Sequence, residues 1–399
     1  MSTHEGALAN PANPAAPAGP GGEGWGTSAT AREIAQQPRV WRELAVTLGE
    51  RAGEIEAFLE PLLARPHLRI VLTGAGTSAF AGELLAPALA QAMRRRVDPV
   101  ASTTIVGGPG AVFVEDVPTL LVSFARSGNS PESVAAAALA DQLLTSVHHL
   151  VVCCHGDSDL AHAYAADDRA LVLLMPPATH DVGFAMTSSF TTMVLGCWFA
   201  LTGTGTAAEV VDRLARGADE LLSAAGEVAA LAERGFSRVA YLGSGPLAGL
   251  AQEAALKLLE LTAGGVLGQH DSPLGFRHGP KAMLTDDTMV VVLRSTDAYT
   301  ARYDDDIVAE LVRDLDPGQV AVLGGGPLPA AVQQGAGWTW RVDGLDGLGD
   351  VPAAVVYAVF VQLFALRSSI VRGLTPDNPF PSGEVNRVVR GVSVHPYTA

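Results

Sequence analysis

Cysteine and positive charge are both scarce in this chain of 399 residues. The three cysteines, Cys153, Cys154 and Cys197, are odd in number and show no CxxC spacing, which argues against a disulfide framework and a cysteine zinc site. Acidic residues outnumber Lys and Arg by 42 to 26, and the net charge is −16. Nucleic acids are bound through clustered Lys and Arg, and only Arg94–Arg96 form such a cluster. We therefore expect no nucleic-acid partner.

The sequence also lacks an export signal and an unbroken membrane-spanning segment. Residues 1–30 are mostly Ala, Pro and Gly without the apolar core of a signal peptide, so we expect a disordered tail. The longest apolar run, residues 183–203, is interrupted by Ser and Thr and predicts a buried helix. These features predict a cytoplasmic protein with reduced cysteines and no membrane partner.

Apolar residues are abundant: they make up 48% of the chain, enough for two buried cores. Short apolar runs alternate with stretches of helical periodicity, which predicts an α/β fold with doubly wound parallel sheets. The pattern restarts near residue 205, so we expect an internal duplication into two domains, 31–205 and 206–399. The expected strands are 69–73, 119–124, 150–154, 170–175, 238–242, 289–293 and 320–323, and the longer expected helices are 32–64, 79–93, 133–144, 185–201, 207–233 and 351–369.

Two turns rich in glycine and hydroxyl groups follow expected strands of the first domain. One is Gly74-Ala-Gly-Thr-Ser78, and the other is Arg126-Ser-Gly-Asn-Ser-Pro-Glu132. Glycines let the backbone approach a ligand, and helix N-termini present unpaired N–H groups that favour anions. Turns after parallel strands gather at one edge of the sheet. The pattern indicates a phosphate site, although helix capping alone would also account for the first turn.

Acid, base and cation lie close together in the stretch 255–281. Lys257 and Glu260 are three residues apart and therefore share one face of a helix. We expect the glycine-broken turn that follows to bring His278 back over this face. A carboxylate and an imidazole beside a phosphate loop can move a proton between neighbouring carbons of a sugar phosphate. The alternative is a solvated salt-bridge ladder of Glu253, Lys257 and Glu260.

Five motifs, in this order, resemble the double sugar-isomerase-domain (SIS) family. They are Thr73-Gly-Ala-Gly-Thr-Ser, Ser123-Phe-Ala-Arg-Ser-Gly-Asn-Ser-Pro-Glu-Ser, Gly183-Phe-Ala-Met-Thr-Ser-Ser-Phe-Thr, Leu274-Gly-Phe-Arg-His-Gly-Pro-Lys and Asp377-Asn-Pro-Phe-Pro-Ser-Gly-Glu-Val-Asn-Arg-Val-Val. The resemblance covers about residue 30 to the C-terminus. It is nearest to the group named galactosamine-6-phosphate deaminase or tagatose-6-phosphate ketose/aldose isomerase. The isomerase half of glucosamine-6-phosphate synthase is a more distant relative.

The resemblance implies roles for individual residues. Glu260 would shuttle the proton between C1 and C2 beside Lys257. His278 of a neighbouring subunit would open the sugar ring, which implies a homodimer or a higher homo-oligomer with a site completed across the interface. The segment 376–394 is expected to cover the site. The residues implied in substrate or phosphate binding are Gly76, Thr77, Ser78, Arg126, Ser127, Asn129, Ser130, Thr187, Ser188, which stands where the synthase has a lysine, and Arg390, near the synthase's C-terminal substrate lysine.

The function implied is an aldose–ketose isomerase and deaminase that converts galactosamine or glucosamine 6-phosphate to a ketose 6-phosphate and ammonia. The glutamine-hydrolysing half of the synthase is absent, so ammonia release or isomerisation is expected. Dehydration of an N-acetylhexosamine 6-phosphate, simple isomerisation, and sugar-phosphate sensing without turnover stay open as alternatives. No cofactor or metal is expected, because the histidines around residues 148–162 lack carboxylates at metal-ligand spacing.

Overall fold

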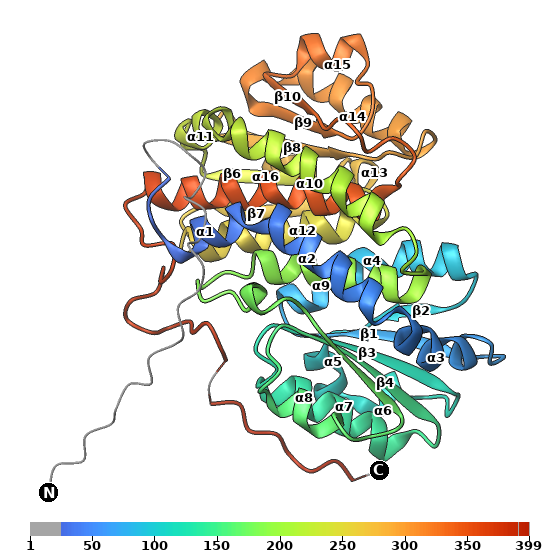
Figure 1. The fold of residues 1–399 in the computed structure, drawn as a ribbon. Coiled ribbons are helices and arrows are strands. Elements are labelled where there is room, and N and C mark those ends of the chain that lie inside the picture. Colours follow the sequence, from blue (N-terminus) through green and yellow to red (C-terminus); the bar gives the residue numbers. More distant parts are fainter. Residues whose placement is uncertain (1–24, 390, 399) are drawn as a thin grey trace, which may run out of the picture.

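Two parallel five-stranded sheets lie at opposite ends of the molecule (Figure 1). The structure, a computed structural model, describes residues 25–389 and 391–398. The strand orders are β2-β1-β3-β4-β5 and β10-β9-β8-β6-β7, and the predicted α/β fold class is confirmed. The strands are β1 Arg69–Thr73, β2 Val97–Pro99, β3 Thr119–Ala125, β4 Val147–Cys153, β5 Ala170–Leu174, β6 Arg238–Leu242, β7 Leu267–Asp271, β8 Thr288–Arg294, β9 Val320–Gly324 and β10 Trp338–Arg341.

The two sheets have the same topology and the same register. In the first sheet Arg69 of β1 lies opposite Thr119 of β3, and in the second Arg238 of β6 lies opposite Thr288 of β8. In each sheet the first strand of that half of the chain lies between the second and the third strand. The fourth strand pairs with the third, and the fifth strand pairs with the fourth. This confirms the predicted internal duplication. Counting along the chain from this register gives equivalent positions in the first and third strands and in the loop and helix that directly follow each.

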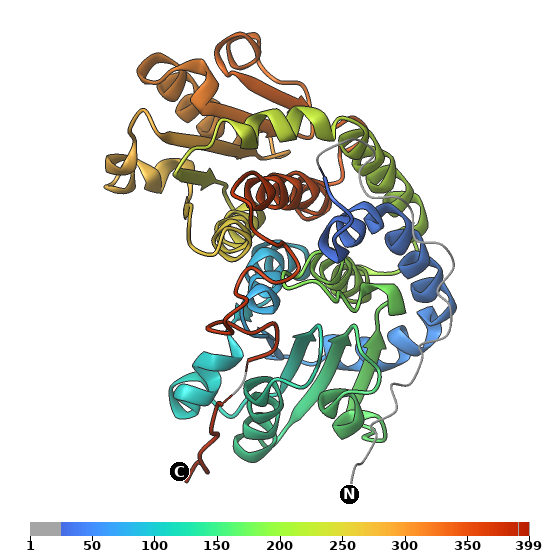
Figure 2. The same cartoon turned by 90° about the vertical axis from the view of Figure 1, so that its left-hand side faces the viewer.

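A layer of helices separates the two sheets, as the views in Figures 1 and 2 agree. Within it α4 packs against α9 and α12, and α16 packs against α10, α11 and α12. The helices are α1 Ala29–Ala35, α2 Gln37–Glu50, α3 Ala52–Leu63, α4 Thr77–Met93, α5 Ser102–Gly107, α6 Pro109–Val112, α7 Pro131–Leu143, α8 Asp159–Tyr164, α9 Ser188–Thr202, α10 Ala207–Ser223, α11 Ala225–Glu233, α12 Pro246–Leu261, α13 Pro273–Phe276, α14 Thr300–Asp314, α15 Ala330–Gly335 and α16 Asp350–Val371.

A glycine with a left-handed backbone precedes the first helix after each sheet's first strand. Gly76 has φ 55° and ψ −128°, and Gly245 has φ 56° and ψ −127°. These two helices, α4 and α12, then approach each other closely, because a Cβ on Gly249 would lie only 2.4 Å from the backbone nitrogen of Leu84. The duplication therefore places two equivalent helix N-termini on a shared helix pair.

The two most apolar helices belong to this central layer. The helix expected over residues 185–201 is α9, and its side chains from Ser188 to Cys197 are all buried. Helix α16 is long and apolar enough to cross a membrane by length and composition alone, but 83% of its apolar window is buried inside the protein. Both are core helices of this fold. The three cysteines are buried and unpaired.

Four expectations about local structure were wrong. The helix expected over residues 32–64 is three helices, α1, α2 and α3, which are separated at Gln36 and Arg51. Residues 207–233 form two helices, α10 and α11, with Ala224 between them; α10 packs against both α2 and α16, and α11 packs against α16. Residues 255–281 contain a strand, β7, at the sheet edge, which leads into the short helix α13. Part of the expected tail is ordered, since Trp25 is buried and α1 begins at Ala29; residues 1–24 lie outside the described part.

The segment after α16 returns to the first half of the chain, as both views show (Figures 1 and 2). The Asp377 carboxylate accepts hydrogen bonds from the backbone N–H groups of Ala29 and Thr30 at 2.8 and 2.9 Å. Phe380 contacts Phe184 with their rings 5.3 Å apart. The described part of the expected covering segment therefore lies against the first half.

Candidate functional site

A small cavity lies at the carboxyl edge of the first sheet. Its volume is about 110 Å³, and its walls come from the start of α4, the loop after β3, the loop before α9 and the C-terminal segment. The hydroxyl-bearing residues that line it are Ser78, Ser127, Ser130 and Ser133. The structure thus brings both predicted phosphate turns to one place, as expected for turns that follow neighbouring parallel strands.

Two arginines give this cavity positive charge in an otherwise acidic protein. Arg126 is buried and donates hydrogen bonds to the carbonyl oxygens of Phe184 at 3.1 Å and Arg387 at 2.7 Å. Arg387 donates to the carbonyl oxygen of Asp181 and also lines the cavity. Its Nε is buried and has no partner among the described residues. Burial, and then the charge of Arg387, lowers the pKa of Arg126. An anion in the cavity would relieve this repulsion.

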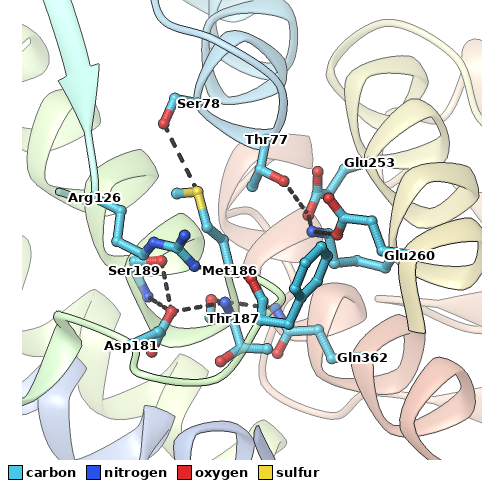
Figure 3. Close-up of polar contacts among 12 residues, drawn as sticks. Thr77, Ser78, Arg126, Asp181, Met186, Thr187, Ser189, Glu253, Glu260 and Gln362 are labelled. Atoms are coloured by element: carbon cyan, nitrogen blue, oxygen red, sulfur yellow. Dashed lines mark hydrogen bonds and ion pairs between the residues drawn. The ribbon is translucent and has the colours of Figure 1, made fainter. Parts of the chain in front are cut away.

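Three ionisable side chains on α12 form a connected group beside the first turn (Figure 3). The Lys257 ammonium lies 3.5 Å from the Glu253 carboxylate and forms an ion pair with Glu260. Thr77, at the start of α4, donates its hydroxyl hydrogen bond to Glu253 at 3.3 Å. The Lys257 side chain is 1% exposed and that of Glu260 is 24% exposed. Glu260 is therefore the member of this group that solvent or a ligand can reach.

Burial changes the protonation of this group. Burial, reinforced by the charge of Glu260, raises the pKa of Glu253 to about 8, although Lys257 and Thr77 act in the opposite direction. Burial alone would lower the pKa of Lys257, but the charges of Glu253 and Glu260 outweigh it, and the pKa is raised. At neutral pH Glu253 is therefore mainly protonated, and Lys257 stays charged beside Glu260. The solvated ladder considered for these residues is wrong, because Glu253 and Lys257 are fully buried.

The group on α12 is electrostatically linked to the cavity. The charge of Glu260 acts on Arg126, and Figure 3 shows Thr77 pointing toward Glu253 while Ser78, the next residue of α4, points toward Met186. Thr77 therefore contacts the α12 group, and Ser78 contacts the cavity wall.

Several predicted substrate residues lie elsewhere. Ser188 is fully buried and donates to the Asp181 carboxylate at 2.5 Å. The hydroxyl of Thr187 is buried and has no hydrogen-bond partner in the described part of the chain. Asn129 is exposed, and its side-chain oxygen accepts a hydrogen bond from the N–H of Asp159 at 2.9 Å, at the start of α8. Thr187, Ser188 and Asn129 therefore do not line the cavity. Arg390 lies outside the described residues.

His278 does not join the α12 group within one chain. Its side chain is exposed, and no hydrogen bond or ion pair connects it to Lys257, Glu260 or the cavity within the part of the chain described. Strand β7 and helix α13 lie between α12 and His278. The expected position of His278 over this face therefore stays a prediction.

Two important residues were missed by the sequence reasoning. Asp181 accepts hydrogen bonds from the N–H groups of Thr187 and Ser189 at 2.7 and 2.9 Å and so holds the start of α9. Arg387 lies in a segment from which Arg390 was selected instead. Asp181 lies six residues before Thr187, the residue that precedes α9, so no local capping pattern identifies it. The position of Arg387 depends on the long-range path of the C-terminal segment, which has no local signal.

Among the described residues, no group of three or more His, Cys, Asp or Glu side chains is placed to hold a metal ion. His149 lies 3.3 Å from Asp141 and stacks on Tyr164, and His155 stacks on His180. These histidines therefore take part in pairwise contacts of the first half.

Comparisons with known proteins place the chain in one family. The SIS domain family matches residues 62–203. A D-galactosamine-6-phosphate deaminase of Shewanella sp. is 40% identical, covering 94% of this chain and 93% of its own. A Streptomyces coelicolor protein whose name assigns it provisionally to the same activity is 52% identical, covering 92% and 95%. The crystal structure of tagatose-6-phosphate ketose/aldose isomerase from Escherichia coli has a TM-score of 0.84 at 39% identity, covering 94% and 98%.

A more distant similarity matches the second predicted resemblance, that to the isomerase half of glucosamine-6-phosphate synthase. The glutamine–fructose-6-phosphate aminotransferase of Pseudomonas aeruginosa is 27% identical over 286 residues, which is 65% of this chain and 42% of that protein. Both levels of the predicted resemblance are therefore confirmed. The first three relatives are matched along nearly their whole length.

Proposed function

The chain belongs to the SIS-domain family of sugar-phosphate isomerases and deaminases, and we propose that it converts a 2-amino-2-deoxyhexose 6-phosphate to the ketose 6-phosphate and ammonia. The observation that carries this proposal is the position of Glu260: a reachable carboxylate, paired with a buried lysine, beside a hydroxyl-lined cavity that holds two arginines. That arrangement suits an anionic substrate with an acidic carbon next to a carbonyl.

The phosphate is proposed to bind in the cavity at the carboxyl edge of the first sheet. Ser78, Ser127 and Ser130 would donate hydroxyl hydrogen bonds, and Arg126 and Arg387 would supply charge. The N-termini of α4 and α7 add unpaired N–H groups. Binding energy from this remote group can hold the reacting carbons in place against Glu260.

Glu260 is the proposed general base. It removes the proton from C2 of the open-chain aldehyde, and the electron pair of that C–H bond forms an enol-type intermediate. Return of the proton to C1 leaves an imine at C2, to which water adds, and ammonia departs as the ketone forms. With a hydroxyl group at C2 the same steps end at the ketose, which is the isomerase outcome named for the Escherichia coli structure. General base catalysis requires such a carboxylate to be ionised.

Lys257 and Glu253 are proposed to hold Glu260 in position through the Lys257–Glu260 ion pair. Lys257 is fully buried and paired with both carboxylates, so this position favours a supporting role over direct contact with an oxyanion. A protonated Glu253 leaves Lys257 free to balance the charge of Glu260. Thr77 joins this group to the first phosphate turn. Phosphate binding and the orientation of the base would thus depend on the same turn.

We propose that a second subunit completes the site with His278. The exposed leucines Leu259, Leu267 and Leu274 lie on α12, β7 and α13, the elements that lead to His278, and exposed apolar groups of this size are typical of interaction surfaces. A mixture of inactive Glu260→Gln and His278→Asn subunits should regain about a quarter of wild-type activity, the statistical share of intact sites in exchanging dimers. A mixture as inactive as its components would contradict a shared site.

Ammonia release tests the reaction itself. Purified protein would be given galactosamine 6-phosphate and glucosamine 6-phosphate in parallel, with the N-acetylated forms as controls. Ammonia and ketose 6-phosphate should appear in equal amounts from one of the free amines, which also identifies the epimer. Interconversion of tagatose 6-phosphate and its aldose without ammonia release from either amine would replace deamination with simple isomerisation. An ultraviolet-absorbing product from an acetylated form would indicate dehydration.

A further inference from the structure

The second half of the chain contains an equivalent of the loop that lines the proposed phosphate cavity. Strand β8 pairs with β6 in the same register in which β3 pairs with β1. Ser295 and Thr296 are therefore the positional equivalents of Arg126 and Ser127. Both loops follow the third strand of their sheet and precede a helix. The fold therefore offers a second anion cradle, formed by Ser295 and Thr296.

This second cradle is already filled by a side chain of the same molecule. The Asp350 carboxylate accepts a hydrogen bond from the Ser295 hydroxyl at 2.6 Å through one oxygen. Its other oxygen accepts from both the N–H and the hydroxyl of Thr296, each at 2.7 Å. The N–H of Ser295 is used by another carboxylate, Asp304, at 2.8 Å. The donors that an anion would need are therefore all engaged.

The cleft beside Asp350 is larger than the cavity of the first half but lacks its reactive groups. Its volume is about 620 Å³, and it is lined by the N-terminus of α12, the loop after β8 and the end of α4. Ala88 and Gln91 of α4 face it, and they are the duplication's counterparts of Lys257 and Glu260 on α12. The second cleft thus has an occupied anion cradle, and an uncharged glutamine stands at the position of Glu260.

We propose that Asp350 is a built-in anion that fills the second phosphate cradle and restricts the chain to one sugar-phosphate site. The inference rests on the proposed phosphate site of the first half, because phosphate is expected in the second cradle only if the equivalent loop of the first half binds it. Its carboxylate satisfies the loop donors permanently and repels a phosphate from the neighbouring cleft. Loss of the carboxylate should open an anion site in the second half.

The test counts phosphate ions bound per chain by equilibrium dialysis with labelled inorganic phosphate. Wild type should bind one, and Asp350→Ser should bind two, because the serine removes the occupant and leaves the donors. Asp346→Ser is the matched control: it removes the same charge from an exposed position in the same loop and should still bind one. The double variant Asp350→Ser, Arg126→Met should keep the second site and weaken the first.

The outcomes separate this inference from the proposed function. No phosphate bound to wild type would overturn the proposed phosphate site, whereas one bound to both wild type and Asp350→Ser would overturn the built-in anion alone. If Asp350→Ser does not fold in phosphate-free buffer, phosphate should restore folding, because a ligand that binds only the native state stabilises it. A variant that stays unfolded at saturating phosphate would also contradict the proposal.

Discussion

The two halves of this chain share a sheet topology and register but differ in what meets at the carboxyl edge of each sheet. In the first half, Arg126 and four serine hydroxyls line a cavity, and α12 contributes Lys257 and Glu260 beside it. In the second half, the equivalent loop holds Asp350, and α4 contributes an alanine and Gln91. The fold alone therefore does not produce a reactive site, and a few side chains at equivalent positions account for the difference.

The comparison also shows how one helix pair serves two clefts. Helices α4 and α12 pack closely where Gly249 meets the backbone of Leu84, so each helix starts at one cleft and ends toward the other. The start of α4 offers Thr77 to the phosphate side, and the second half of α12 offers Glu260 to the same place. The duplication thus supplies the anion turn and the base from different halves of the chain.

The largest loss of turnover is expected from replacing the proposed general base, Glu260. Glu260→Gln should lower turnover by at least about a hundredfold, because it removes a general base while keeping the shape of the side chain. Gln91→Ala, at the equivalent position of the second cleft, should leave turnover within about twofold, in line with a surface change remote from the reaction. Steady-state ammonia release measures both. Equal losses of turnover in the two variants would contradict the proposal that only the site of the first half is reactive.

A smaller effect is expected from the charge in the first loop. Arg126→Met should raise KM about 10- to 100-fold, the equivalent of losing a charged hydrogen bond worth about 1.5–3 kcal/mol. Ser295→Ala, its counterpart, should leave KM unchanged and lower the melting temperature instead, because its hydroxyl holds Asp350. The measurement is KM for the amino-sugar phosphate alongside thermal unfolding. A KM for Arg126→Met equal to that of wild type would place the phosphate elsewhere.

A separate effect is expected in the pH dependence of the free energy of unfolding. The pKa of Glu253 is about 8 in the folded chain and about 4.3 when unfolded, so the folded state binds more protons between these values. Stability should therefore fall as the pH rises through this window. Glu253→Gln should flatten that slope, and denaturant unfolding at several pH values measures it. A variant with the wild-type slope would show that Glu253 is ionised at neutral pH.

Much of the candidate site was predictable because its signals are local. The turns after β1 and β3 were identified from glycines and hydroxyls that follow short apolar runs, and the three-residue spacing of Lys257 and Glu260 placed them on one helix face. The edge strand β7 was not identified, because its sequence, Leu-Gly-Gln-His-Asp, lacks the branched residues typical of strands and pairs on one side only.

Other features depend on contacts that no local pattern encodes. The protonation of Glu253 follows from its complete burial between helices, and the role of Arg387 follows from the return of the C-terminal segment. The break at Ala224 has no proline to mark it in the sequence, although α10 alone of the two helices also packs on α2. His278 was assigned by resemblance, and its position on the surface makes its role a question of assembly.

The most direct test of the account is the rate at which the C2 hydrogen leaves the substrate. Release of tritium to water from a 2-tritiated amino-hexose 6-phosphate would be measured in wild type, Glu260→Gln and Glu253→Gln at neutral pH. The account predicts release near the wild-type rate for Glu253→Gln, because that side chain is already neutral, and a loss of at least about a hundredfold for Glu260→Gln. Tritium release at the wild-type rate from Glu260→Gln would contradict it.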